Sequence, residues 1–150
     1  MDTKTAQPDA KYYGVQSGMD LVFHHLGVAC RDLDAEEQVW KPLGYVRESA
    51  DFEDPRQQIR GRFLVGPGPR LELLVGTPGS TVLDPWLSRG IKIYHQAFEV
   101  PAVAGAIEAL VADGARVVVE PVPAVAFGGR EIAFLMLGNG SLIEVIQRPG

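Results

Sequence analysis

Two histidines and two glutamates recur at matching places in the two halves of the sequence. His25 and His95 each open an apolar run typical of a β-strand, and the offset between them, 95 − 25, is 70 residues. Glu72 and Glu144 each lie within a Leu- or Ile-rich run, and their offset, 144 − 72, is 72 residues. A nearly constant offset is typical of a duplicated unit. Each half therefore offers one histidine on its first strand and one glutamate on its last.

These four residue types indicate a metal site. A lone carboxylate in an apolar strand is costly to bury unless it is paired or bound to a cation. Two imidazoles and two carboxylates suit a divalent ion with room for one or two waters or substrate oxygens, and Co, Mn, Ni, Zn or Fe(II) all fit. Structural zinc fits less well because it usually takes cysteine ligands. We therefore expect a divalent metal ion to be held by His25, Glu72, His95 and Glu144.

The elements that must position these residues repeat as well. The first half is predicted to contain strands at 22–30, 45–48, 59–66 and 70–75, with a helix that begins after Asp32 and ends near Gly44. The second half is predicted to contain strands at 94–100, 117–120, 130–137 and 142–147, with a helix over 101–113. A short helix near 82–87 joins the halves, and residues 49–58 and 121–129 are predicted loops.

This order predicts an α+β fold. Each half reads as a βαβββ module, at about 21–76 and 92–148, and the two modules would pair around a cleft within a single domain over 21–150. Residues 1–20 mix charged, Pro and Gly residues without a period, so we expect them to form a flexible N-terminal arm.

Composition excludes several classes of partner. The formal net charge is −5 and the pI is near 5.1, which argues against a nucleic-acid surface and leaves a small neutral or anionic molecule as the expected partner. No apolar run is long enough for a membrane helix, and the first twenty residues lack the apolar core of a signal peptide. A single cysteine, Cys30, cannot form an internal disulfide. We expect a cytoplasmic protein that does not bind membranes.

Other candidates are given structural roles. Strand alternation predicts that His24 faces away from His25. Cys30 ends an apolar strand with no basic neighbour to activate it, so we expect it in the core, together with Trp40 and Trp86. Arg60 and Arg62 share one strand face and could hold an anionic substrate, although exposed strand arginines are common.

Five motifs together resemble the vicinal oxygen chelate superfamily (glyoxalase, bleomycin resistance and dioxygenase proteins), nearest to its methylmalonyl-CoA epimerase-like and glyoxalase-like members. The motifs lie at 25–34, 71–74, 94–100, 127–135 and 140–147, and the resemblance covers about 22–148. It implies metal ligation by the same four residues, a homodimer, and a loop at the mouth of the cleft that contacts substrate. The residues implied in substrate contact are Gly128, Gly129 and Arg130 in that loop, and we add Arg60 as a candidate.

The chain departs from the epimerase pattern at two places. The epimerase carries a second carboxylate opposite its metal-side glutamate, where this chain has Gly61, and a usual His-Pro pair is replaced by Met136 and Leu137. The superfamily's shared chemistry, in which a metal chelates adjacent substrate oxygens and stabilises an enolate, does not need the lost groups.

Three functions remain open at this point. They are an epimerase or isomerase of a carbonyl or acyl-thioester substrate, a glyoxalase-type or other metal-assisted lyase, and a non-catalytic protein that sequesters a small molecule such as an antibiotic. The complete ligand set favours chemistry over sequestration. If the protein is an epimerase or isomerase, we expect Glu144 to be both metal ligand and base, and the proton to return from Glu144, Glu72 or Glu53.

Overall fold

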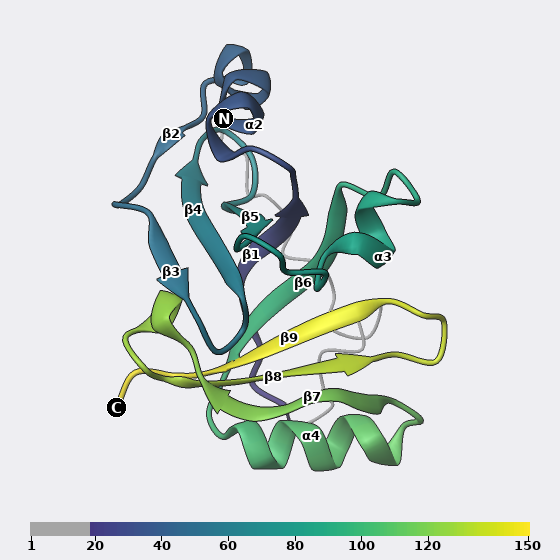
Figure 1. The fold of residues 1–150 in the computed structure, drawn as a ribbon. Coiled ribbons are helices and arrows are strands. Elements are labelled where there is room, and N and C mark those ends of the chain that lie inside the picture. The colour runs from purple at the N-terminus through teal and green to yellow at the C-terminus, as the bar shows by residue number, and fades with distance from the viewer. Residues whose placement is uncertain (1–18) are drawn as a thin grey trace, which may run out of the picture.

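The computed structural model describes residues 19–150 (Figure 1). The arm predicted for residues 1–20 therefore lies outside the described residues, apart from its last two. Of these two, Asp20 pairs with Arg148 through a 2.8 Å contact between Oδ2 and Nη1.

The two halves share a first strand, a helix and a set of later strands, and the first half has the additional strand β3 (Phe52–Asp54). The first half comprises β1 (Val22–Ala29), α2 (Leu33–Trp40), η1 (Lys41–Leu43), β2 (Val46–Arg47), β3 (Phe52–Asp54), β4 (Ile59–Val65) and β5 (Leu71–Gly76). The short helix α3 (Asp84–Leu87) lies between the halves. The second half comprises β6 (Ile93–Val100), α4 (Val103–Ala112), β7 (Arg116–Pro123), η2 (Val125–Phe127), β8 (Glu131–Met136) and β9 (Leu142–Gln147).

All strands belong to one open mixed sheet. Its order is β2-β4-β5-β1-β6-β9-β8-β7, and β3 pairs with β4 outside this path. Within the modules β1 runs parallel to β5 and β6 runs parallel to β9, while β1 and β6 pair antiparallel and so join the modules at their first strands. The α+β fold of two βαβββ modules is confirmed.

Each module packs a helix against one face of its strands. Asp32 starts α2 by accepting a 2.8 Å hydrogen bond from the Ala35 amide, which satisfies one of the free donors at the helix start. In the second module α4 covers β7, β8 and β9 (Figure 1), with Val103 and Ala106 buried against Leu135 and Val145. The opposite faces of the strands are left for the site between the modules.

The loop predicted over 49–58 is wrong in its central part. Phe52–Asp54 pairs antiparallel with β4, and Asp54 is only 1% exposed. Its carboxylate accepts hydrogen bonds from the Gln57 amide at 3.1 Å, the Gln57 side chain at 2.9 Å and the Val125 amide at 3.1 Å. Because Val125 belongs to η2, Asp54 ties the β3–β4 hairpin of one module to the loop of the other. The charged sequence concealed this role because the charge is satisfied by backbone donors.

Replacing Asp54 by alanine should destabilise the protein. Three donors would lose their acceptor, which we expect to lower the free energy of unfolding by roughly 2–4 kcal/mol in urea denaturation. Glu53→Ala on the same strand is the matched control, because Glu53 is exposed, and it should change stability by less than about 0.5 kcal/mol. Equal effects of the two substitutions would show that Asp54 does not bridge the modules.

Candidate metal centre

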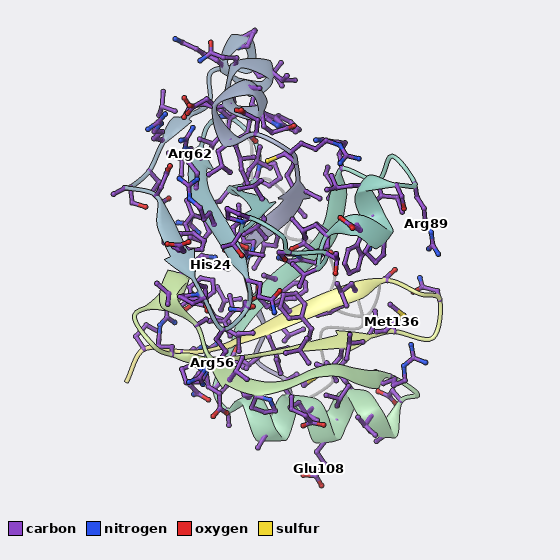
Figure 2. The ribbon with its side chains drawn as sticks, in the orientation of Figure 1. His24, Arg56, Arg62, Arg89, Glu108 and Met136 are labelled. Carbon is purple, nitrogen blue, oxygen red and sulfur yellow. The ribbon has the colours of Figure 1, made fainter. Side chains whose placement is uncertain are left out.

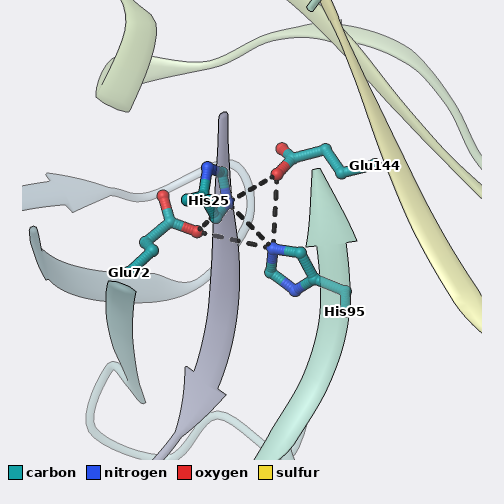
Figure 3. Close-up of side chains that lie close together, drawn as sticks. All are labelled: His25, Glu72, His95 and Glu144. Atoms are coloured by element: carbon teal, nitrogen blue, oxygen red, sulfur yellow. Dashed lines mark hydrogen bonds and ion pairs between the residues drawn. The ribbon is translucent and has the colours of Figure 1, made fainter. Parts of the chain in front are cut away.

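Strand register brings the four predicted ligands to one point. The parallel pairs place Glu72 beside Gly27 and Glu144 beside Ala97, which are repeat-related positions two residues after each histidine. The antiparallel pair of β1 and β6 places His25 opposite Ala97 and Gly27 opposite His95. The four side chains therefore converge from four adjacent strands (Figure 3).

One atom of each side chain faces the same small space. His25 Nε2 lies 3.1 Å from His95 Nε2, and 3.2 Å from both Glu72 Oε1 and Glu144 Oε1. His95 Nε2 lies 3.3 Å from Glu144 Oε1 and 3.7 Å from Glu72 Oε1. All four atoms lie within 4.8 Å of one another. Ligand atoms about 2.1 Å from a common ion are separated by roughly 3.0–3.4 Å, so this spacing fits a divalent metal ion.

Burial of the two carboxylates favours a cation at this place. The four residues are between 0% and 4% exposed, and Glu144 Oε1 has no hydrogen-bond partner among residues 19–150. Burial alone would lower the pKa of His25, but the charges of Glu72 and Glu144 outweigh it and raise that pKa to about 9. Burial likewise favours protonated Glu144, yet the imidazoles of His25 and His95, which lie 3.2 and 3.3 Å from Oε1, outweigh it and lower its pKa to about 2. Without a metal, a proton on His25 supplies the positive charge.

Gly27 makes room for the His95 ring. A Cβ atom at Gly27 would lie 2.0 Å from Cε1 and 2.2 Å from Nδ1 of His95, well inside van der Waals contact. The ring therefore lies directly against the β1 backbone. A glycine two residues after His25 is thus required by the position of the other histidine.

A β-bulge precedes each histidine. The β1–β6 register slips by one residue at His24 and again at Tyr94, so each of these residues has no partner across the ladder. Their offset, 94 − 24, is 70, so the bulges belong to the repeat. The predicted position of His24 on the opposite face is therefore wrong: its ring lies edge-on to His25, with centroids 5.0 Å apart. Tyr94 lies edge-on to His95 in the same way, at 4.5 Å.

The two bulge residues have different surroundings. His24 Nδ1 lies 2.8 Å from Nδ1 of His25, and its ring packs against Phe63 and Phe127. Burial, together with the nearby charges of His25 and Arg70, lowers the pKa of His24 to about 4, so it is a neutral acceptor for His25. Such a partner fixes which ring nitrogen of His25 faces the site. Tyr94 instead lines a cavity next to Glu72 and Glu144.

The cavity beside the cluster has a volume of about 310 Å³ and mostly apolar walls. Glu72 and Glu144 form part of its surface, and aromatic rings from both modules surround them. The aromatic residues of the wall are Phe52, Trp86, Tyr94, Phe127 and Phe134. Sequence reasoning missed most of them and assigned Trp86 to the core; the 70-residue offset from His24 could have drawn attention to Tyr94.

Phe52 occupies the space in front of Gly61. A Cβ atom at Gly61 would lie 2.1 Å from Cζ of Phe52, so any side chain there would displace the ring. The neighbouring Glu53 is exposed and is absent from the residues that line the cavity. A carboxylate supplied by Glu53 would require β3 to rearrange.

The predicted substrate-binding residues do not line this cavity. Arg60 is exposed and outside the cavity lining. Arg62, which is labelled in Figure 2, is buried and ion-paired with Asp51 and with Asp34 of α2. Arg130 pairs with Glu99 at 2.8 Å. Gly128 and Gly129 border a second, more open depression beside η2.

Cys30 lies in the core, as predicted. It is 2% exposed and its thiol donates to the Leu74 carbonyl at 3.4 Å. Burial raises the pKa of the thiol to about 11, so it stays protonated at neutral pH.

The Gly27→Ala variant should lose the metal. The new methyl group would push the His95 ring off the site, so we expect the wild type to bind one Co(II) per chain in titration calorimetry and the variant to bind it at least about 100-fold more weakly. Gly105→Ala is the matched control, because a Cβ atom at Gly105 meets nothing within 4 Å, and it should bind like the wild type. Undiminished binding by Gly27→Ala would exclude His95 as a ligand.

The stability of the metal-free protein should fall as pH rises from about 6.5 to 9. The pKa of His25 is higher in the folded protein than its ordinary 6.5, so its stabilising effect is complete below pH 6.5 and is lost through about pH 9. The effects of Glu144 and His24, whose pKa values are lowered on folding, are already complete above pH 6.5. Urea unfolding at several pH values measures the slope, and His25→Gln should abolish it.

The apparent affinity for Co(II) should change in the opposite direction to the stability of the metal-free protein over the same pH range. Metal binding requires His25 to lose its proton, so the apparent affinity for Co(II) should rise between pH 6.5 and 8.5. An affinity for Co(II) that does not change with pH would contradict the assignment of His25 as a ligand.

The family comparison covers most of the chain. A model of the glyoxalase/bleomycin resistance protein/dioxygenase superfamily matches residues 24–134. A search of curated proteins gives no match.

Solved structures agree in fold. A hypothetical protein from Bacillus halodurans is 24% identical with a TM-score of 0.73, over 87% of this chain and 96% of that one. Methylmalonyl-CoA epimerase from Mycobacterium tuberculosis is 25% identical with a TM-score of 0.70, over 85% of this chain and 88% of that one. A methylmalonyl-CoA epimerase in complex with methylmalonyl-CoA is 26% identical with a TM-score of 0.70, over 87% and 96%. The resemblance seen in the sequence is thus confirmed by a match to the family and by structures that share the fold, and the chain belongs to the glyoxalase/bleomycin resistance protein/dioxygenase superfamily.

Proposed function

We propose that this protein is a divalent-metal-dependent enzyme that moves a proton next to the carbonyl group of a small substrate, in the manner of an epimerase or isomerase. The observation that carries the proposal is the buried set of two histidines and two glutamates that opens onto an apolar cavity. Similarity to methylmalonyl-CoA epimerases at about 25% identity supports the reaction type. A homodimer and a cytoplasmic location remain predictions.

The metal would be held by His25, Glu72, His95 and Glu144. When bound, it would supply Lewis-acid polarisation of the substrate carbonyl and so lower the pKa of the adjacent C–H group. Co, Mn, Ni, Zn and Fe(II) all remain candidates, because imidazole and carboxylate ligands suit each of them.

Glu144 is the proposed base. Its carboxylate faces the cavity and is ionised at neutral pH, so it can accept a proton from a substrate held there. Aromatic and aliphatic walls exclude water from the reacting carbon, and this prolongs the life of the carbanionic form.

Few groups of the cavity can return the proton to the substrate carbon. Gly61 offers no acid, Phe52 covers its position, and the carboxylates of the cavity wall are Glu72 and Glu144. We therefore favour a one-base route, in which Glu144 removes and returns the proton, over the two-base route of the epimerase pattern. Glu72 is the alternative donor, because it faces the same cavity from the other module.

A metal-assisted lyase or glyoxalase-type reaction is the second candidate. The same buried ligand set would support it, because polarisation of a carbonyl is common to both reactions. A lyase reaction that leaves the α-C–H bond intact would show no proton exchange that depends on Glu144, whereas a glyoxalase-type reaction would be identified by its thioester product.

Solvent exchange should identify the base. In D2O, the Co(II)-loaded protein should exchange the α-proton of at least one compound from a panel of acyl-CoAs, 2-oxo acids and hemithioacetals, followed by proton NMR. Glu144→Gln should lower that rate by about 10²–10⁴-fold, because general-base catalysis contributes about this much. Glu72→Gln, its repeat-related control, should weaken Co(II) binding to a similar degree but retain exchange once loaded with metal.

Two results would contradict this scheme. Equal exchange by wild type and Glu144→Gln, both loaded with Co(II), would remove Glu144 from proton transfer. Turnover without α-exchange by the native protein would favour the lyase reading.

A further inference from the structure

We propose that the cavity selects a ligand with two adjacent oxygen atoms and an apolar substituent about the size of a phenyl ring. The inference rests on the proposed function, because the oxygens are expected at the metal cluster. It goes further by assigning the chemistry of the rest of the ligand.

Among residues 19–150, both carboxylates of the cluster line the apolar cavity. On the side of His24, the rings of Phe63 and Phe127 pack against that imidazole at 5.9 and 5.3 Å, and His24 is outside the cavity lining. On the other side, Tyr94 lines the cavity together with both glutamates. The two repeat-related bulges thus differ, and a ligand on the cluster must extend along the Tyr94 side.

The walls on that side are aromatic and aliphatic. Trp86 of α3 packs against Tyr94 with ring centroids 4.8 Å apart, and Leu74 and Leu83 line the same space. The charged residues of the lining are Glu72 and Glu144 at the cluster and Arg56, which is exposed. Away from Arg56, an ionised group on the substituent would be buried against apolar surface at a cost, and an anionic group would also be repelled by the two carboxylates.

Phe52 strengthens this selection. Its ring fills the space at Gly61 and packs against Phe63 at 5.7 Å, so a position that could have carried an acid presents a hydrocarbon surface instead. A flat apolar group would therefore have an aromatic neighbour from β3 in addition to those from α3 and β6.

The size of the cavity also limits the ligand. Its volume of about 310 Å³ is at the lower end of the roughly 300–1,000 Å³ that is typical of small-molecule sites. This space suits a compact chelating group with one ring, and any longer part of a ligand must lie outside the cavity.

Three chelators that share the same pair of oxygens test the inference. Benzohydroxamate carries a phenyl group, acetohydroxamate a methyl group, and succinate monohydroxamate a carboxylate. Calorimetric titration of the Co(II)-loaded protein should give an affinity for benzohydroxamate about 30-fold higher than for acetohydroxamate, because burying a phenyl group contributes about 2 kcal/mol. Succinate monohydroxamate should bind no more tightly than acetohydroxamate. Titration of free Co(II) corrects for the strength of each chelator.

Two variants locate the effect. Trp86→Ala removes one wall of the cavity and should reduce the preference for the phenyl group to about fivefold or less. Trp40→Ala is the matched control, because Trp40 packs against Tyr45 in the first module's core, and it should keep the full preference. Circular dichroism verifies that both variants fold.

Repeating the titrations without metal separates the two proposals. If Co(II) does not strengthen chelator binding, the metal-dependent function fails, while the ratio of the two neutral chelators still measures the cavity. A ratio near one in the wild type, or an equal ratio in wild type and Trp86→Ala, would overturn the selection of an apolar substituent. A higher affinity for succinate monohydroxamate would instead show that the site accepts an acidic substituent.

Discussion

Two carboxylates that are buried side by side need positive charge between them. Glu72 and Glu144 come from opposite modules and meet within 4.8 Å of each other, where little water is available to screen them. The two imidazoles are close enough to both carboxylates to neutralise them through a proton or to share a metal ion with them. The pairing of β1 with β6 therefore satisfies a charge requirement as well as joining two halves of a sheet.

Repetition explains how so few residues build the centre. The same relation of histidine, small residue and glutamate occurs in both modules, as Gly27 beside Glu72 and Ala97 beside Glu144. Antiparallel pairing of the two first strands then turns the modules toward each other. The small residues serve different purposes, because only Gly27 lies against an imidazole ring so closely that a methyl group is excluded.

Sequence patterns identified this centre because the offset between the halves preserves strand register. They could not identify the bulges at His24 and Tyr94, since a bulge depends on how two distant strands pair, and alternation along one strand then gave His24 the wrong face. Sequence patterns also missed β3, because Phe52 is flanked by acidic residues. Asp54 can be buried because the backbone amides of Gln57 and Val125 donate hydrogen bonds to it. Satisfaction of a buried charge by distant donors leaves no local sequence signal.

The two modules differ in the surroundings of His24 and Tyr94, and this difference determines how a ligand reaches the centre. The rings of Phe63 and Phe127 pack against His24, and the same enclosure at Tyr94 would leave no path for a ligand on that side. Were both sides open, two carboxylates would face solvent and the charges that raise the pKa of His25 would be screened. Because the His24 side is enclosed, the charges of Glu72 and Glu144 act strongly on His25. Because the Tyr94 side borders the cavity, a ligand can still enter there. Because His24 is enclosed and Tyr94 borders the cavity, a ligand can approach the duplicated centre from the Tyr94 side.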